Sequence, residues 1–254
     1  MVIGPFLGLT AMQQWGYSFM FSISLIFSLC ALGIAFFIKL PNNQHVSEKN
    51  LSKSGFKLKD MFELSAIPIS IVAALFAIIY SSVLSFVSVY STELGLVEFA
   101  SFFFVVYALV LLVSRPFTGK WFDHYGENFI IYPCILMFAI GMFLLSQTQS
   151  AFMFLFSAGL IGLGWGTLFP SFQTIAIQEA PPNQRGLATA TFLSIFDLGI
   201  AFGSFFIGMI AIKVDFSSLY FYGSFLILFG LIIYYFLHGK SQVVKKHIKT
   251  STSI

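Results

Sequence analysis

The feature that most constrains this chain is a series of long apolar runs that are almost free of Asp, Glu, Lys and Arg. A helix that crosses a bilayer needs about 20 mostly apolar residues, within a range of roughly 17–25. Seven runs reach or approach that length, at residues 18–38, 66–90, 99–114, 128–146, 151–173, 186–212 and 216–237. A shorter apolar piece covers residues 2–12. The pattern predicts an all-α integral membrane protein with about seven full transmembrane helices and a partial one.

Composition excludes the other broad classes. Apolar residues make up 58% of the chain and charged residues 9%, whereas a soluble domain carries roughly 25% charged residues. The sequence contains no G-x-x-x-x-G-K-[S/T] loop, so we expect no nucleotide as the energy source. No group of His, Cys or carboxylate residues converges within the runs, and His124 with Glu127 supplies too few ligands for a metal. We therefore predict no enzyme, no metal, no cofactor and no nucleic-acid partner.

The positions of the basic residues predict the orientation of the spans. Lys and Arg are enriched in the cytoplasmic loops of membrane proteins. When the spans alternate in direction, one side of the membrane receives twelve basic residues and the other side receives only Lys213. The twelve are Lys39, Lys49, Lys53, Lys57, Lys59, Arg115, Lys120, Arg185, Lys240, Lys245, Lys246 and Lys249. This asymmetry predicts a multi-pass protein of the plasma (inner) membrane with its C-terminus in the cytoplasm.

Four short motifs flank or interrupt these runs. The most specific is segment 115–126, which contains Gly119, Asp123 and Gly126 in the pattern G-x-x-x-D-x-x-G. The others are Gly4-Pro5-x-x-Gly8, Gly162-x-Gly164-x-Gly166-x-x-x-Pro170 and Pro181-Pro-Asn-Gln-Arg185-Gly186. Together they resemble the motifs of major facilitator superfamily transporters, and the Gly-Pro motif resembles that of the drug/proton antiporters. The resemblance covers essentially the whole chain.

The resemblance implies a major facilitator-type helix bundle that is truncated at its N-terminal side. Residues 1–38 would be a partial helix 5 and helix 6 of the N-terminal half, and residues 39–64 the cytoplasmic linker between halves. Residues 65–238 would form the C-terminal six-helix half, and residues 239–254 a cytoplasmic tail. On this alignment, helices 1–4 and the start of helix 5 are not in the chain.

Segment 115–126 is expected to be a loop that acts as a gate. Gly119 and Gly126 permit a tight turn between helices. Asp123 can accept hydrogen bonds from the N-terminus of a neighbouring helix, where the helix dipole favours an anion. Arg115 and Lys120 are close enough in sequence to complete a charge network. The resemblance implies a conformational latch, and the alternative is an ordinary basic cytoplasmic loop.

Asp197 is the one charge well inside a predicted span. An ionisable side chain in hydrocarbon costs roughly 2.5–3.5 kcal/mol on insertion scales, so it is expected to face the bundle interior or water. Two roles remain open at this stage. Asp197 is a proton-coupling site or counter-charge for a substrate, or it is a structural acid that is hydrogen-bonded to neighbouring helices.

Helical spacing also predicts a substrate wall and packing surfaces. Two helix faces carry Ser81, Ser85 and Ser88 in the 66–90 run, and Trp165, Phe169 and Gln173 in the 151–173 run. The resemblance makes these runs helices 7 and 10, which line the central cavity in the family, and the alternative is helix–helix packing. The Gly199-x-x-x-Gly203 and Gly4-Pro5-x-x-Gly8 patterns permit close helix approach and predict packing sites.

These features predict a secondary transporter that exports drugs or small amphipathic metabolites in exchange for protons. The expected partners are a small-molecule substrate and the lipid bilayer, and the proton gradient is the energy source. Uptake of a sugar or metabolite, or export of a metallophore, is the alternative within the family. Alternating access needs both walls of the pathway, so the chain is either paired with a separately encoded N-terminal half or is a membrane fragment that does not transport.

Overall fold

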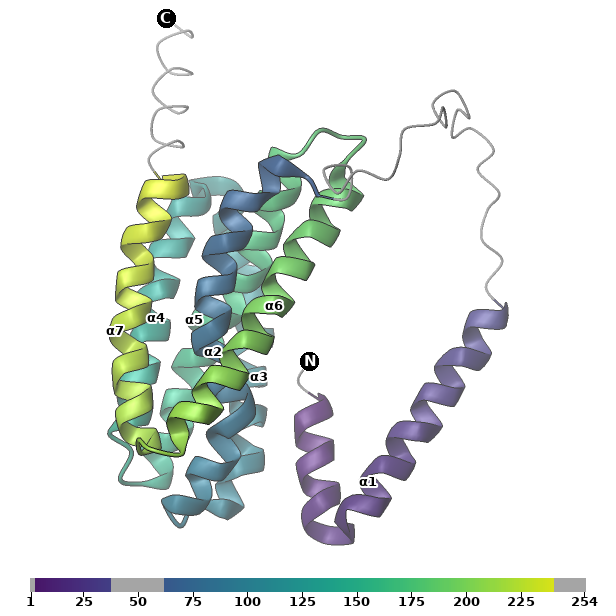
Figure 1. Ribbon diagram of the computed structural model, residues 1–254, viewed down its shortest axis with the longest axis vertical. Helices are drawn as coiled ribbons and strands as arrows, with labels where there is room; N and C mark the ends of the chain where they lie inside the picture. The colour runs from purple at the N-terminus through teal and green to yellow at the C-terminus, as the bar shows by residue number, and fades with distance from the viewer. Residues whose placement is uncertain (1–2, 38–61, 240–254) are drawn as a thin grey trace, which may run out of the picture. The chain divides into compact units, whose positions relative to one another are not determined.

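The computed structural model describes residues 3–37 and 62–239 and divides the chain into two compact units, Met1–Asp60 and Met61–Ile254 (Figure 1). Within the described ranges, seven helices are long and apolar enough to cross a membrane. The prediction of an all-helical membrane protein is therefore confirmed. Most of the predicted linker at residues 39–64, and residues 240–254 of the predicted tail, lie outside the described residues.

The described part of the first unit is one bent helix, α1 (Ile3–Phe37). The bend lies at Gly16, whose backbone φ of 81° is in the left-handed region that favours glycine. The sequence predicted a break at this place, between a short apolar piece and a full span. The residues of α1 that meet the criteria for a span are Trp15–Ile34.

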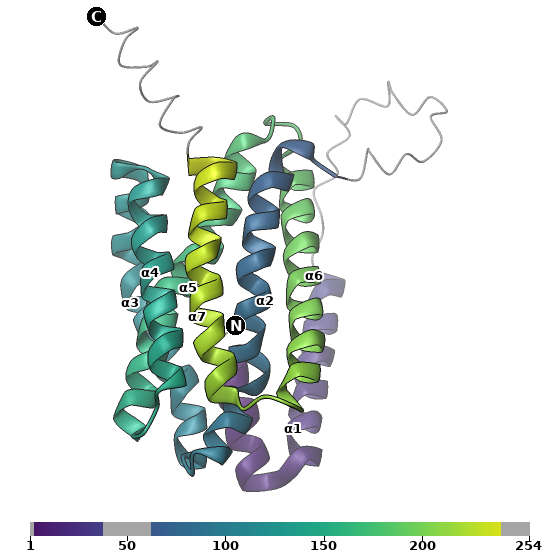
Figure 2. The ribbon, with the colours of Figure 1, turned by 60° about the vertical axis from the view of Figure 1, so that its left-hand side comes forward.

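The second unit contains six long helices that run side by side in alternating directions (Figures 1 and 2). The long helices are α2 (Ile67–Glu93), α3 (Ala100–Tyr125), α4 (Glu127–Ser146), α5 (Ala151–Glu179), α6 (Arg185–Ala211) and α7 (Phe216–Tyr234). Two short 3₁₀ turns, η3 (Leu64–Ala66) and η4 (Val97–Phe99), precede α2 and α3. A π-helical turn, η5 (Tyr235–Gly239), follows α7.

Side-chain caps determine where several of these helices begin. The Glu63 carboxylate accepts hydrogen bonds from the backbone and hydroxyl of Ser65 at the start of η3. At the start of α7, the Asp215 carboxylate accepts a hydrogen bond of 2.9 Å from the Ser218 backbone N–H. The hydrogen bonds from Ser218 hold the pKa of Asp215 below its ordinary value. Each cap satisfies donors that a helix leaves free in its first turn.

Three helices, α2, α3 and α5, continue at their C-terminal ends beyond the apolar runs that predicted them. The expected loop at residues 115–126 is wrong for most of its length, because α3 continues through Arg115, Gly119, Lys120 and Asp123 to Tyr125. The turn itself is confined to Gly126, whose φ is 88°. The physical reason is that a charge marks where a helix leaves the hydrocarbon, whereas the backbone hydrogen bonds of the helix continue in water.

The six helices associate through close backbone contacts. α2 packs against α6, α3 packs against α5, and α4 packs against both α5 and α7. At the first of these interfaces, Gly199 faces Ala74 and Gly203 faces Ile78. A Cβ atom on Gly203 would lie 2.6 Å from the Ile78 carbonyl oxygen and would also collide with the Ser81 hydroxyl. Small residues at such positions let helix backbones approach in the membrane.

We expect Gly203→Ala to destabilise the second unit by roughly 1–3 kcal/mol, the usual cost of forcing a methyl group into a packed contact. The thermal unfolding midpoint of the purified chain in detergent, followed by circular dichroism, measures this. Gly186→Ala is the matched control in the same helix, because a Cβ there meets no atom within 4 Å. Equal midpoints for the two variants would contradict the close α2–α6 contact.

Candidate functional site

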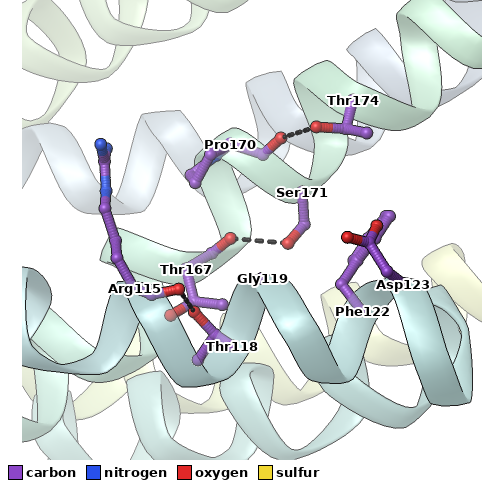
Figure 3. A pocket seen from close by; sticks show the side chains of 9 residues that line it. All are labelled: Arg115, Thr118, Gly119, Phe122, Asp123, Thr167, Pro170, Ser171 and Thr174. Atoms are coloured by element: carbon purple, nitrogen blue, oxygen red, sulfur yellow. Dashed lines mark hydrogen bonds between the residues drawn. The ribbon is translucent and has the colours of Figure 1, made fainter.

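A groove of about 280 Å³ separates the later turns of α3 from the middle of α5 (Figure 3). Six of its nine lining residues carry polar or charged side chains, and the lining consists of Arg115, Thr118, Gly119, Phe122, Asp123, Thr167, Pro170, Ser171 and Thr174. The hydroxyls of Ser171 and Thr174 each donate at 2.8 Å to a carbonyl one turn earlier in α5. Their oxygen lone pairs remain available as acceptors toward the groove.

The two charged residues of the groove lie at opposite ends of it. The Arg115 and Asp123 side chains are separated along α3 in Figure 3, and the guanidinium of Arg115 points away from the carboxylate. Eight residues of helix correspond to roughly 12 Å. In the described part of the chain, the structure forms no ion pair among Arg115, Lys120 and Asp123. All three side chains are exposed on this unit.

A cluster of aromatic rings forms at the centre of the second unit, around Trp165 of α5. The Trp165 ring lies between Tyr80 of α2, with centroids 4.8 Å apart, and Phe196 of α6, with centroids 6.0 Å apart. Phe138 of α4 contacts the same ring at 5.6 Å. Trp165 is buried, with 3% of its surface exposed. Aromatic residues from three other helices therefore contact this tryptophan.

The cluster continues to a more accessible position one turn farther along α5. Phe169 contacts Phe196 at a centroid distance of 4.7 Å and Phe192 at 5.8 Å. Phe169 and Tyr80 are both half-buried, and so is Gln173 one turn beyond Phe169. Along the predicted face, solvent exposure therefore increases from the buried Trp165 to the half-buried Phe169 and Gln173.

The three predicted serines lie apart from this aromatic wall. Ser81 is buried beside Gly203, and its hydroxyl donates to the Ile78 carbonyl of its own helix at 2.6 Å. The Ser85 hydroxyl lies 3.0 Å from the Ser204 hydroxyl of α6. Ser88 is half-buried. The structure therefore brings Ser81 and Ser85 to the α2–α6 contact.

Asp197 is exposed on the surface of α6 and is not enclosed within the six helices of this unit. The sequence had allowed it to face either the bundle interior or water. At helical spacing on its face lie the small or polar Ser194, Ala201 and Ser204 and the half-buried apolar Leu193 and Ile200. A different exposed face of α6 carries large apolar side chains, namely Leu198, Phe202, Phe205 and Met209. The surface of α6 thus carries a stripe around Asp197, in which small and polar residues lie with the half-buried Leu193 and Ile200, and a separate face of exposed large apolar side chains.

The remaining predicted packing residues belong to α1. Gly8 is half-buried, and a Cβ there would lie 3.9 Å from the Met20 sulfur, which is an ordinary contact distance. Gly4 and Pro5 lie in the first turns of α1.

One polar cluster was not singled out by the sequence pattern. His238 of η5 is buried between Glu127 of α4, at 2.9 Å, and Glu179 of α5, at 3.8 Å. The signal was present in the sequence, because both glutamates directly border the long uncharged run at residues 128–178. What the sequence did not show is that the end of the last helix lies beside both of them.

Comparison with known proteins gives one family. The family model of the Major Facilitator Superfamily matches residues 1–204 and, in a second overlapping match, residues 99–252. The chain is 22% identical over 234 residues to a staphylopine export protein of Staphylococcus aureus, which covers 86% of this chain and 57% of that protein. It is 28% identical over 97 residues to multidrug resistance protein 3 of Bacillus subtilis, covering 38% of this chain and 19% of that protein.

A third relative is an uncharacterized MFS-type transporter of Methanocaldococcus jannaschii, 28% identical over 127 residues, or 50% of this chain and 32% of that protein. The chain therefore spans at most 57% of these curated relatives. No solved structure matches the chain.

The aromatic cluster predicts a specific response to loss of one ring. Phe196→Ala should destabilise the unit by roughly 3–5 kcal/mol, the usual cost of removing a buried Phe side chain. It should also shift Trp165 fluorescence to longer wavelength, because one face of the indole ring loses its cover. The measurement uses a chain in which Trp15 and Trp121 are replaced by Phe. Phe202→Ala, at a position that is 55% exposed on the same helix, should change neither property.

Proposed function

This chain belongs to the major facilitator superfamily, and we propose that it forms part of a proton-coupled exporter of small amphipathic molecules in the plasma membrane. The family supports a membrane transporter that carries a small molecule across the bilayer. Export is favoured because two relatives, the staphylopine export protein and multidrug resistance protein 3, carry export or drug resistance in their names. Uptake of a metabolite is the second candidate, since the same family architecture serves both directions.

The observation that carries proton coupling is the exposed carboxylate of Asp197 in the middle of α6. A carboxylate at this depth is unfavourable against lipid tails. On α6 it lies beside Ser194, Ala201 and Ser204, whereas the exposed large apolar side chains Leu198, Phe202 and Phe205 are centred on a different face. We therefore propose that the Asp197 stripe faces a water-filled pathway, where the carboxylate exchanges protons with the solvent.

The substrate wall in this proposal is the accessible part of the aromatic cluster. Phe169 and Tyr80 offer half-buried ring surfaces, and Gln173 offers an amide that can donate and accept hydrogen bonds. The buried stack of Trp165 on Tyr80 and Phe196 holds this surface rigid. A rigid apolar surface with few polar groups suits a partly apolar ligand.

The α3–α5 groove is proposed as the gate of the same pathway. Arg115 and Asp123 are exposed and directed apart, so both are available to charged partners outside the second unit. Alternating access requires two walls that rock against each other around the binding site. The basic residues around this end of the helices favour its placement in the cytoplasm, together with the C-terminus.

The test is efflux of ethidium, an amphipathic cation, from membrane vesicles with an imposed proton gradient. The chain is expressed alone and together with a segment that supplies the first helices of the family fold. We expect gradient-dependent efflux from the paired sample, and we expect Asp197→Asn to reduce it to background because an amide cannot carry the proton.

Glu98→Gln is the matched control, since Glu98 is an exposed carboxylate in the short turn before α3. It should leave efflux unchanged. Equal efflux from Asp197→Asn and Glu98→Gln would refute the role of Asp197. Efflux from the chain alone would show that the pathway needs no second half, and absence of efflux from every sample would refute export of amphipathic cations.

A further inference from the structure

A second pocket, of about 330 Å³, lies where the end of α4 meets the start of α7. These two helices pack side by side (Figures 1 and 2). The pocket is lined by Gln147, which directly follows α4, and by Ser217, Ser218, Phe221 and Tyr222 of the first two turns of α7. None of these residues belongs to the α3–α5 groove, the aromatic cluster around Trp165 or the Asp197 stripe. The α4–α7 pocket therefore needs an explanation of its own.

The serine hydroxyls of this pocket offer acceptor lone pairs. The Tyr90 hydroxyl donates to the Leu145 carbonyl at 3.1 Å and lies 3.0 Å from the Ser217 hydroxyl. Because the Tyr90 proton is engaged by Leu145, the Ser217 hydroxyl donates to the Tyr90 oxygen. The Ser218 hydroxyl donates to the Asp215 carboxylate at 2.9 Å. Both serine oxygens can therefore accept hydrogen bonds from a ligand.

Gln147 adds an amide at the rim of the pocket. Its side chain is exposed, and its amide nitrogen donates one hydrogen bond to the Ser146 hydroxyl at 3.3 Å. An amide nitrogen carries two N–H bonds, so the other N–H and the amide oxygen can pair with a ligand. The pocket thus offers mainly acceptor oxygens together with a donor N–H. A ligand with several hydroxyl groups matches this set, because each hydroxyl both donates and accepts.

The charges around the pocket favour an uncharged ligand. The residues that line it carry no charged side chain, so neither a bound phosphate nor a bound ammonium group would find an opposite charge to offset its desolvation. The nearby Asp215 carboxylate is bonded to the backbone and hydroxyl of Ser218. In the described residues, the loops at this end of the unit carry Glu93, Glu98 and Asp215 against Lys213, which further disfavours an anion.

Two aromatic rings form the apolar wall of the pocket. Phe221 is half-buried and lies edge-on to Tyr222, with centroids 5.8 Å apart. Phe143 of α4 contacts Phe221 at a centroid distance of 5.9 Å. Aromatic faces bind apolar surface, and a few polar groups then orient the ligand. A sugar ring has both properties without charge, since its C–H face is apolar and its edge carries hydroxyls.

An apolar strip leads from the pocket along α7 toward the middle of the helix. Tyr222, Phe225 and Phe229 follow one another at helical spacing and are 64%, 53% and 57% exposed. Phe225 also contacts Phe221, with centroids 5.0 Å apart. Lipid tails are as apolar as such side chains. A headgroup in the pocket can therefore continue into acyl chains that lie on this strip.

We propose that the α4–α7 pocket binds the headgroup of a glycolipid, namely a diacylglycerol with an uncharged sugar. The sugar ring packs on Phe221 and Tyr222 and forms hydrogen bonds with Gln147, Ser217 and Ser218, and the acyl chains follow the strip on α7. The depth is suitable, because the stretches long and apolar enough to span a membrane end at Ser146 and begin at Phe216. This site does not depend on the proposed transport function.

The test is a titration of the purified full chain with monogalactosyl diacylglycerol, with bound lipid measured by native mass spectrometry. The detergent is lauryldimethylamine oxide, because a maltoside detergent would present a sugar of its own. Phosphatidylglycerol and phosphatidylethanolamine with the same acyl chains are the charged comparison lipids. Methyl β-galactoside supplies the sugar without acyl chains. We expect the galactolipid to bind more tightly than all three.

The combined variant Gln147→Leu and Ser217→Ala removes hydrogen-bonding groups from the pocket but leaves the bond from Tyr90 to Leu145. It should lower the affinity for the galactolipid about tenfold, the effect of losing two hydrogen bonds of ordinary net strength. Gln149→Leu is the matched control, because Gln149 is an exposed amide in the same turn and does not line the pocket. It should bind the galactolipid as the parent chain does.

Tyr222→Leu tests the aromatic wall even if the combined variant does not fold. Leucine keeps an apolar side chain at this exposed position but removes the ring, so binding of the galactolipid should weaken. Tyr235→Leu is its control, since Tyr235 is an exposed tyrosine directly after the other end of α7. It should leave binding unchanged.

Three results would overturn the proposal. Equal galactolipid affinity in the parent chain, the combined variant and Tyr222→Leu would refute the site. Binding of either phospholipid as tightly as the galactolipid would refute the preference for an uncharged sugar. Binding of methyl β-galactoside as tightly as the galactolipid would refute the role of the acyl chains and of the strip on α7.

Discussion

The structure depends on one constraint, which is that every backbone N–H and C=O within the bilayer must find its partner inside the protein. No water is present in the hydrocarbon to replace a missing partner. A continuous helix meets this requirement for a single span, because its backbone groups bond to one another. Even the hydroxyl side chains follow this rule. Ser81, Ser171 and Thr174 donate to carbonyls of their own helices, three or four residues earlier. The helices are thus self-sufficient in hydrogen bonds before they associate.

Association must then come from packing, because lipid tails are as apolar as the helix surfaces. The contacts with the least space are those at glycines, such as Gly203 against Ile78 in the α2–α6 pair. Large rings fill the remaining volume, and Trp165 with Tyr80 and Phe196 joins α5 to α2 and α6. In the described residues of the second unit, most charged side chains lie near helix ends, and Asp197 lies in the middle of α6.

Three polar places in the second unit follow this distribution. The groove between α3 and α5 combines exposed charges with hydroxyls near the end of a span. Asp197 lies in the middle of α6, on the face that also carries Ser194, Ala201 and Ser204. His238 lies at the end of α7, where two carboxylates and two helix ends meet. In the proposed function, the groove is the gate and Asp197 is the site of proton coupling.

The sequence by itself determined the class of the protein, the number of long helices and the break at Gly16, because these follow from local hydropathy and backbone preference. It also predicted that Trp165, Phe169 and Gln173 share one helix face. It did not determine where the helices end, since α3 continues through the charges at Arg115 and Asp123 to Gly126. Only the tertiary structure placed Asp197 on an outer stripe, Ser85 beside Ser204, and His238 between Glu127 and Glu179. The physical reason is that periodicity fixes a side chain's direction on its own helix, whereas its neighbours depend on which helices pack together and at what rotation.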